Sequence, residues 1–225
     1  MAQLYKMGEV TIKMIILFDL DGTLIDSTDA ILESFHHSFD VHKLTHPSDD
    51  AIKALIGYPL DVMYVELGVD KKIAWDLVGT YKEHYRKIST QKTYLLESAK
   101  EAVIEASKFA ILGIVTTKTG LYSRVLMEHF ELMDYFEVLI GREDVENPKP
   151  HAEPILKALE SLDTNNKEIW IIGDTKLDLI SAKNAGINSI GVLSGYDEHA
   201  ILKEYTDVIF NDAYEAVEYL QNRKK

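Results

Sequence analysis

Hydrophobic residues occur in short blocks along the chain, and the spacing within each block predicts a strand or a helix. The first block, residues 14–18, consists of five consecutive apolar residues, which is too short for a helix and is typical of a buried strand. Asp19, Asp21 and Gly22 follow it directly. Glycine accepts backbone angles that other residues avoid, so Gly22 favours a sharp turn at this point. The pattern therefore predicts a buried strand that ends in a polar turn.

A long helical region follows this turn. Between residues 27 and 93 the apolar residues recur at helical spacing, and no strand-like block interrupts them. The first helix can begin at Asp26 or Ser27, which are both good N-cap residues. The spacing predicts four helices, over residues 27–41, 50–56, 60–67 and 71–87. This region is predicted to be an insertion rather than a continuation of a sheet.

From residue 96 onward, helical and strand-like blocks alternate. The predicted helices cover residues 97–108, 121–130, 151–162, 179–185, 201–205 and 213–221. The predicted strands cover residues 110–116, 136–140, 168–173, 189–193 and 207–210. Alternation of this kind implies right-handed crossovers and a parallel sheet with helices on both faces. We therefore expect an α/β core domain of residues 1–26 and 94–225, with a helical domain of residues 27–93 inserted after the first strand; residues 1–13 are expected to form a loose arm.

Polar residues gather at the predicted strand ends. Asp19 and Asp21 are two residues apart, so they project to the same side if the strand geometry continues. Two unpaired carboxylates at such a position would repel each other, and the arrangement therefore calls for a cation. Aspartate and glycine are also common in ordinary turns, but two aspartates directly behind a buried strand make that interpretation the weaker one.

Three further polar segments are predicted to lie at the same edge of the sheet. They are Thr116-Thr117-Lys118, Gly173-Asp174-Thr175 with Asp178 beyond it, and Asn147-Pro148-Lys149-Pro150. Each is weak evidence alone, because threonines are common at strand ends and Asp178 could simply cap a helix. Ligands bind at the carboxyl ends of parallel strands, so their combination at one edge predicts a functional site.

Composition narrows the possible functions. The 225 residues are 46% hydrophobic and carry a net charge of −13, which argues against a nucleic-acid-binding surface. The absence of cysteine excludes disulfides, thiolate metal sites and a cysteine nucleophile. No stretch approaches the ~20 apolar residues needed to span a membrane, and the N-terminus lacks a signal-peptide core. A cytoplasmic protein without membrane or nucleic-acid partners is the expectation, with the oligomeric state left open.

The motifs, taken together, resemble those of the haloacid dehalogenase-like phosphohydrolases. In this chain the four motifs of that family read Asp19-Leu20-Asp21-Gly22-Thr23, Thr116, Lys149 and Gly173-Asp174 to Asp178. The resemblance covers nearly the whole chain and implies a Rossmann-like core with a small helical cap. The segments Leu24 to Ser27 and Lys149 to Pro154 are similar to the phosphoglycolate phosphatase-like branch, although Thr117 stands where that branch usually has asparagine.

The resemblance implies a role for each acidic residue. Asp19 would attack phosphorus and form an aspartyl phosphate, and Asp21 would protonate the leaving oxygen and then take a proton from water. Mg²⁺ would be held by the Asp19 carboxylate, the Asp21 backbone carbonyl and Asp174, because it prefers oxygen ligands. Asp178 would orient these ligands from outside.

The resemblance also implies a phosphate-binding set. Thr116 would donate a hydrogen bond to a phosphoryl oxygen, and Lys149 would offset charge on the nucleophile and the transferring group. The backbone around Thr117 and at Leu20 would supply further N–H donors. The loop of residues 56–59, which separates two helices of the insertion, is expected to reach down toward the leaving group.

The function that fits best is a Mg²⁺-dependent phosphatase of a small phosphorylated metabolite, most like a phosphoglycolate phosphatase. An inorganic pyrophosphatase of the same branch is the first alternative, because the segment Glu33 to His36 also resembles those enzymes. A phosphosugar mutase would use the same Asp19 and Asp21. A dehalogenase needs neither the second aspartate nor a metal, and a non-catalytic binding module would be favoured only by a broken motif. His36 and His37 are expected to be surface or packing residues of the insertion.

Overall fold

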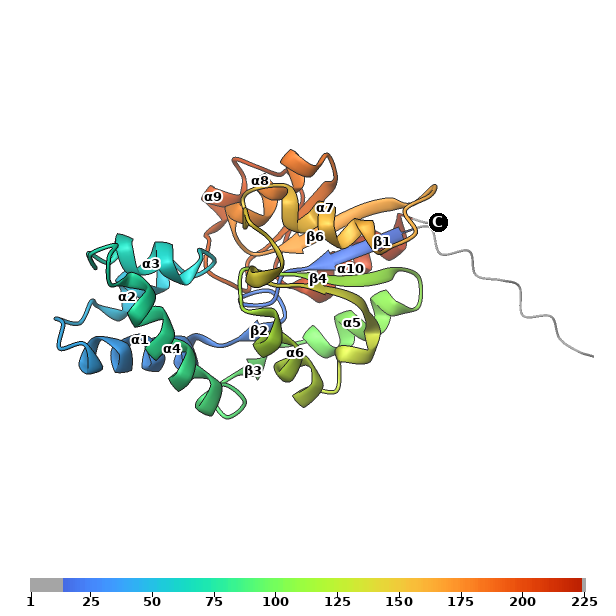
Figure 1. Ribbon diagram of the computed structural model, residues 1–225. Helices are drawn as coiled ribbons and strands as arrows, with labels where there is room; N and C mark the ends of the chain where they lie inside the picture. Colours follow the sequence, from blue (N-terminus) through green and yellow to red (C-terminus); the bar gives the residue numbers. More distant parts are fainter. Residues whose placement is uncertain (1–13, 224–225) are drawn as a thin grey trace, which may run out of the picture.

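The computed structural model describes residues 14–223, and its centre is a parallel sheet of six strands (Figure 1). The strand order is β5-β4-β1-β6-β7-β8. The strands are β1 (Met14–Phe18), β4 (Ile111–Val115), β5 (Phe136–Ile140), β6 (Glu168–Gly173), β7 (Asn188–Val192) and β8 (Ile209–Phe210). β1 lies between β4 and β6, which places the carboxyl end of β1 at the centre of one sheet edge. The predicted α/β class is therefore confirmed.

Helices cover both faces of this sheet (Figure 1). Alternate residues of a strand point to opposite faces, and the apolar residues of β1 therefore need a covering layer on each side. Ile16 and Phe18 of β1 pack in one core cluster with α5 (Ala99–Ser107) and α10 (Ala213–Asn222). Ile15 and Leu17 pack in another cluster with α7 (Glu153–Glu160) and α8 (Lys176–Ala185). The remaining helices of the core are α6 (Gly120–His129), α9 (His199–Leu202), η1 (Met133–Tyr135) and η2 (Arg142–Asp144). Burial on both faces explains why β1 reads as an unbroken apolar run.

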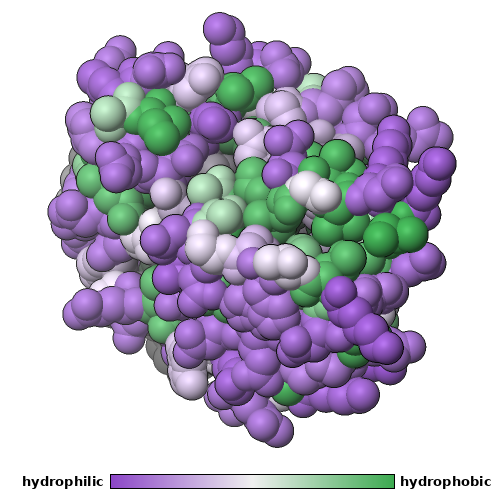
Figure 2. Space-filling view, turned by 90° about the vertical axis from the view of Figure 1, so that its left-hand side faces the viewer, coloured by the Kyte–Doolittle hydropathy of each residue, from purple (hydrophilic) through white to green (hydrophobic). Residues whose placement is uncertain are grey.

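Four helices form a separate layer at one end of the molecule, which we call the helical lobe (Figure 1). They are α1 (Thr28–Val41), α2 (Asp49–Lys53), α3 (Leu60–Glu66) and α4 (Ala74–Ile88). The lobe has its own hydrophobic cluster, in which the Phe35 ring centroid lies 4.7 Å from that of Tyr64 and 5.1 Å from that of Tyr81. Viewed from the lobe end, the surface shows hydrophobic residues bordered by hydrophilic ones (Figure 2).

The chain enters and leaves the lobe through a two-stranded antiparallel ribbon that the hydropathy pattern did not predict. Its strands are β2 (Ile25–Asp26) and β3 (Tyr94–Leu95), and Asp26 pairs with Tyr94. Strands of two residues are too short to show a periodic pattern. The ribbon ties the two connections between lobe and sheet to each other.

Most predicted boundaries agree with the structure to within a few residues, and α8 is an instructive exception. The sequence predicted a helix from residue 179, whereas α8 begins at Lys176. Thr175 and Asp178 form a capping box at its start, which satisfies free backbone N–H groups and extends the helix toward the sheet. The predicted helix over residues 71–87 is also shifted, since α4 begins at Ala74. The expected N-terminal arm lies outside the described residues.

Among residues 14–223, no helix combines the length and the apolar character that a membrane crossing requires.

Candidate active site

The carboxyl ends of three neighbouring strands bring the predicted residues together. Asp19 follows β1, Thr116 follows β4, and Asp174 follows β6. Because β4, β1 and β6 are adjacent and parallel, these three side chains start from the same edge of the sheet. All three are at least 96% buried, with exposed fractions of 4%, 4% and 0%.

Lys149 joins the site from the loop before α7 and connects two of the acidic residues. Its ammonium lies 2.9 Å from a carboxylate oxygen of Asp19, forms an ion pair with Asp178, and donates a hydrogen bond to the Val115 carbonyl at 3.1 Å. Burial lowers the pKa of Lys149, but the charges of Asp178 and Asp19 outweigh this effect and hold its pKa above the usual value. Lys149 is therefore a fixed positive charge beside Asp19.

Burial makes the carboxyl group of Asp19 hard to ionise in the absence of a further cation. Desolvation raises the pKa of Asp19 to about 7, while Lys149 acts in the opposite direction and Asp178 and Asp21 add to the rise. Burial and then the charges of Asp19 and Asp178 likewise raise the pKa of Asp174 well above its usual value. One lysine does not compensate this group of carboxylates, so the site favours an additional cation.

Asp19, Asp174 and Asp178 could hold that cation. Each offers an oxygen, and the three oxygens lie within 4.8 Å of one another. Asp174 accepts a hydrogen bond from the Thr23 hydroxyl at 3.0 Å and one from the Tyr196 backbone N–H at 2.9 Å. Three buried carboxylates form the hard, oxygen-rich donor set that suits Mg²⁺.

Two glycines leave the space that the Asp174 carboxylate occupies. A Cβ atom on Gly195 would lie 1.9 Å from an Asp174 carboxylate oxygen, and one on Gly22 would lie 2.2 Å from it. Gly22 also has a φ of +82°, which other residues rarely adopt. The backbone of both loops therefore packs directly against this carboxylate and fixes its position.

Asp21 is held by a second lysine, whose side chain is 8% exposed. The Lys118 ammonium lies 2.9 Å from one Asp21 oxygen, and the Ser27 hydroxyl donates to the other. The same ammonium lies 4.7 Å from the centre of the Tyr85 ring. Burial lowers the pKa of Lys118, but Asp21 and Tyr85 outweigh it and leave the pKa raised. Asp21 is thus anchored beside Asp19 by residues of β4's loop and of the connection into α1.

The two threonines after β4 differ in their contacts. The Thr116 hydroxyl accepts a hydrogen bond from the Lys118 backbone N–H at 3.2 Å. The Thr117 hydroxyl donates to the Gly57 carbonyl at 2.8 Å, which links the sheet to the loop between α2 and α3. The loop of residues 56–59 thus contacts the core, whereas its expected approach to the leaving group stays a prediction. The phosphate-binding role expected of the backbone around Thr117 stays a prediction, since the contact with Gly57 involves only the hydroxyl.

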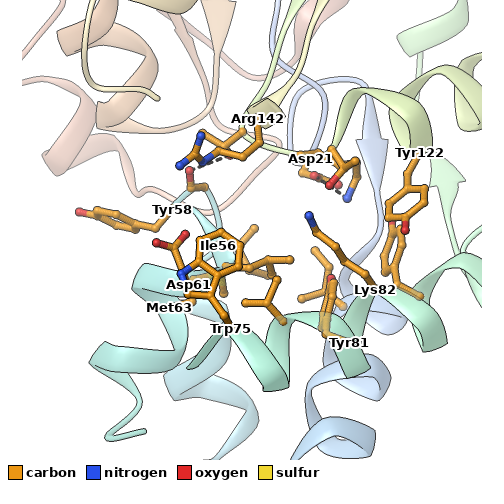
Figure 3. Close-up of a pocket in the computed structure, with 18 residues that line it drawn as sticks. Asp21, Ile56, Tyr58, Asp61, Met63, Trp75, Tyr81, Lys82, Tyr122 and Arg142 are labelled. Carbon is orange, nitrogen blue, oxygen red and sulfur yellow. Dashed lines mark hydrogen bonds and ion pairs between the residues drawn. The ribbon is translucent and has the colours of Figure 1, made fainter. Parts of the chain in front are cut away.

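A cavity of about 70 Å³ extends from Asp21 into the space between the sheet and the helical lobe (Figure 3). The core side of its wall is mostly polar: Asp21, Thr117, Lys118, Thr119, Tyr122 and Arg142. The lobe side is mostly apolar: Ile31, Ile56, Gly57, Tyr58, Leu60, Asp61, Met63, Trp75, Val78, Tyr81, Lys82 and Tyr85. The cavity therefore adjoins Asp21 at the sheet edge where the predicted residues meet.

Comparison with known proteins decides the family. The family model of the haloacid dehalogenase-like hydrolases matches residues 16–192. The chain belongs to this family. A pyrophosphatase PpaX from Halalkalibacterium halodurans is 34% identical over 176 residues, which cover 77% of this chain and 80% of the relative. One from Anoxybacillus flavithermus is 31% identical over 205 residues, with 86% and 94% covered.

Solved structures of the family agree with this fold. A hydrolase of the haloacid dehalogenase-like family from Streptococcus pneumoniae has a TM-score of 0.83 and 28% identity, and covers 93% of this chain and 99% of its own. The present chain therefore belongs to the family, and to the hydrolase class, that its motifs predicted. Its four motifs converge at one sheet edge, as their positions relative to the predicted strands and helices indicated.

Sequence reasoning did not assign a role to two residues of this hydrolase's site. Lys118 was noted only as part of the Thr116-Thr117-Lys118 segment, although its ammonium pairs with Asp21 as that of Lys149 pairs with Asp19. Gly195 was not singled out, since a single glycine in a loop gives no chemical signal. The positive charge directly after the strand-end threonines was the available signal for Lys118.

Proposed function

We propose that this hydrolase is a Mg²⁺-dependent phosphatase that acts on a small phosphorylated metabolite through an aspartyl-phosphate intermediate. The observation that carries the proposal is the buried Asp19 carboxylate at the end of β1, with the Lys149 ammonium 2.9 Å away and Asp21 two residues further on. A nucleophile, a fixed positive charge and a second carboxylate at one strand end are the parts that phosphoryl transfer requires.

In the first step, an Asp19 carboxylate oxygen forms a bond to phosphorus while the bond from phosphorus to the leaving oxygen breaks. Asp21 gives its proton to that leaving oxygen, so an alcohol departs and an aspartyl phosphate remains. In the second step, Asp21 takes a proton from water, whose oxygen attacks phosphorus and displaces the Asp19 carboxylate. Inorganic phosphate leaves, and both aspartates return to their starting state.

Thr116 and Lys149 are proposed to bind the phosphoryl oxygens during both steps. Lys149 is fixed by Asp19, Asp178 and the Val115 carbonyl, so its charge needs no reorganisation when negative charge develops. Backbone N–H groups at Leu20 and Thr117 are further candidate donors.

Mg²⁺ is proposed to be held by the Asp19 carboxylate, the Asp21 backbone carbonyl and Asp174. The fit rests on the buried carboxylates within 4.8 Å of one another and on the glycines that make room for Asp174. Both carboxylate oxygens of Asp178 already accept hydrogen bonds, from Lys149 and from Thr175, which supports an orienting role. When bound, the metal neutralises charge on the phosphoryl group.

The helical lobe is proposed to be a cap of residues 27–93 over a core of residues 1–26 and 94–225. Its contacts with the core beside the site include the Thr117–Gly57 hydrogen bond and a bond of 3.0 Å between the Thr28 and Tyr196 hydroxyls. A closed cap excludes bulk water from the aspartyl phosphate, which supports a small substrate over a phosphoprotein or a nucleic acid. The net charge of −13 also disfavours a polynucleotide.

Phosphoglycolate is the substrate that the motifs of the branch favour. Pyrophosphate is the second candidate, because relatives 31–34% identical to this chain carry the name pyrophosphatase PpaX.

A phosphate-release assay tests the proposal. The purified protein should release phosphate from several small phosphate compounds with Mg²⁺ present, and the release should stop when the metal is chelated and resume when Mg²⁺ is restored. Asp207→Asn, which changes an aspartate whose side chain is 92% exposed, should behave as the wild type. Absence of release from every compound, or release that is indifferent to chelation, would contradict the proposal.

A further inference from the structure

The cavity beside Asp21 carries two basic side chains that have no ion-pair partner. Arg142, at the start of η2, and Lys82, in α4, both line it. Neither forms an ion pair within residues 14–223. They differ in this from Lys118 in the same wall, whose ammonium is paired with Asp21.

Arg142 is held close to the catalytic aspartates by the backbone. Its N–H donates a hydrogen bond to the Lys118 carbonyl at 3.0 Å, and the Lys118 ammonium in turn lies 2.9 Å from Asp21. The preceding residue, Gly141, packs against the neighbouring loop, because a Cβ atom on it would lie 2.3 Å from the Gly120 nitrogen. The loops after β4 and β5 are therefore in direct backbone contact, and Arg142 starts beside the residue that holds Asp21.

The Arg142 guanidinium has donors to spare. Its five N–H groups can all donate, and Nη1 donates to the Val145 carbonyl at 3.0 Å. The Nε atom is buried and has no hydrogen-bond partner among residues 14–223. A buried donor without a partner costs free energy, and a carboxylate can accept from two nitrogens of one guanidinium at once. Arg142 is therefore suited to bind an anion that enters the cavity.

Lys82 approaches the cavity from the opposite wall. Figure 3 shows its ammonium end directed from α4 toward the core side, where Asp21 and Arg142 lie. An anion between Lys82 and Arg142 would contact the helical lobe and the core at the same time. The charge of such a ligand would thus favour closure of the lobe over the site.

The charges of the cavity wall match a single negative charge. The charged side chains among the lining residues are Asp21, Asp61, Lys82, Lys118 and Arg142. Three positive groups against two negative ones leave a charge of +1, because Lys118 is paired with Asp21 and Asp61 offsets one of the other two. A charge that loses its hydration is costly unless it is paired, so a leaving group with one negative charge fits better than one with several or with none.

The volume of the cavity limits the leaving group to a short chain. About 70 Å³ is roughly half of the ~150 Å³ that holds a benzene ring. A ring-sized alcohol is therefore too large, whereas an alcohol of a few non-hydrogen atoms fits.

We infer that Arg142, with Lys82 opposite it, binds a carboxylate on the leaving group, and that the preferred substrate is accordingly a short phosphorylated hydroxy acid. This inference rests on the proposed phosphatase function, and it assigns the choice of substrate to two residues outside the four motifs. It also decides between the two substrates considered above, because the phosphate released from pyrophosphate carries more than one negative charge.

Phosphoglycolate and its carboxamide test the inference directly. They differ in one group of nearly the same shape, a carboxylate against an uncharged amide. The amide withdraws electrons more strongly, so its alcohol is at least as good a leaving group, and a preference for the acid reports binding of the charge. We expect kcat/KM for phosphoglycolate to be at least ~10-fold higher than for the carboxamide, the effect of one hydrogen bond to a charged group. It should also exceed kcat/KM for pyrophosphate.

Substitutions of the two basic residues assign the preference to them. Arg142→Gln should lower kcat/KM for phosphoglycolate at least ~10-fold and leave the value for the carboxamide nearly unchanged. Arg142→Lys keeps the charge without the planar fork and should lose less. Lys82→Met should weaken the preference in the same direction. Lys87→Met is the matched control, because Lys87 is an exposed lysine of the same helix that does not line the cavity.

The outcomes separate this inference from the proposed function. Equal kcat/KM for phosphoglycolate and its carboxamide, or a higher value for pyrophosphate, would overturn the inference and leave the phosphatase proposal intact. A ratio of acid to amide that Arg142→Gln and Arg142→Lys both leave unchanged would also overturn it, since other residues would then select the substrate. Failure of all compounds to release phosphate would refute both.

Discussion

Gly195→Ala is expected to disable the metal site without changing any group that reacts. Gly195 has an ordinary backbone conformation, so alanine is accepted there by the chain itself. The added Cβ would lie 1.9 Å from a carboxylate oxygen of Asp174 and 2.3 Å from its carboxyl carbon. Ordinary van der Waals contact begins near 3.4 Å, so the carboxylate or the loop must move by about 1.5 Å.

That displacement is large on the scale of metal coordination. Ligand distances in metal sites vary by only ~0.2 Å, so an Asp174 oxygen moved by about 1.5 Å no longer serves as a ligand. We expect the Mg²⁺ concentration for half-maximal activity to rise at least ~10–100-fold, as it does for changes around metal ligands. Overpacking of this kind also costs about 1–3 kcal/mol of unfolding free energy, which lowers Tm by roughly 2–12 °C.

A Mg²⁺ titration of phosphate release, together with thermal unfolding, measures both effects. Gly79→Ala is the matched control, because Gly79 is exposed within α4 and a Cβ there meets nothing within 4 Å. This control should keep its Mg²⁺ dependence and gain up to about 1 kcal/mol of stability. A Gly195→Ala protein that is folded and has the Mg²⁺ dependence of the wild type would refute the reasoning, because Asp174 would then not be fixed by that contact or would not bind the metal.

Three further predictions concern the acidic residues. Asp19→Asn should abolish turnover while the protein stays folded, because an amide cannot act as the nucleophile; steady-state phosphate release by a folded variant would exclude Asp19 from that role. Asp21→Asn should lower kcat by ~10²-fold or more for an alkyl phosphate and by less for an aryl phosphate, whose leaving group needs less protonation; equal losses would assign Asp21 to structure instead. Asp174→Ala should lose activity that added Mg²⁺ hardly restores, whereas Asp178→Ala should mainly raise the Mg²⁺ requirement, by ~10–100-fold. If a metal titration instead finds that Mg²⁺ restores Asp174→Ala and not Asp178→Ala, their roles as ligand and orienting residue would be exchanged.

The parts of the fold that sequence reasoning predicted well are those where burial leaves a strong pattern. β1, β5 and β6 were predicted residue for residue, because each is an apolar run bounded by polar or turn-forming residues. The start of α8 was missed because Asp178 was considered as the cap of a helix that begins at residue 179. In the structure Thr175 is the N-cap, and Asp178 lies inside the helix and completes the capping box.

The candidate site likewise has residues that the sequence predicted and contacts that it did not. Asp19, Asp21 and Asp174 were predicted because each follows a predicted strand of the parallel sheet, and Lys149 because its segment precedes a helix at the same edge. The pairing of Lys118 with Asp21 and the contact of Gly195 with Asp174 join residues that are distant in sequence. Such contacts are fixed by the folded backbone, and no local pattern encodes them.

The short ribbon of β2 and β3 has a consequence for how such an enzyme can acquire new substrates. Asp26 and Tyr94 face each other across the ribbon, so the chain leaves the core and returns to it at neighbouring points. An inserted segment has only to begin and end within one strand spacing, whatever its length or internal fold. The inserted segment can therefore be lengthened, shortened or replaced without a change in the sheet, and the residues at the strand ends keep their positions.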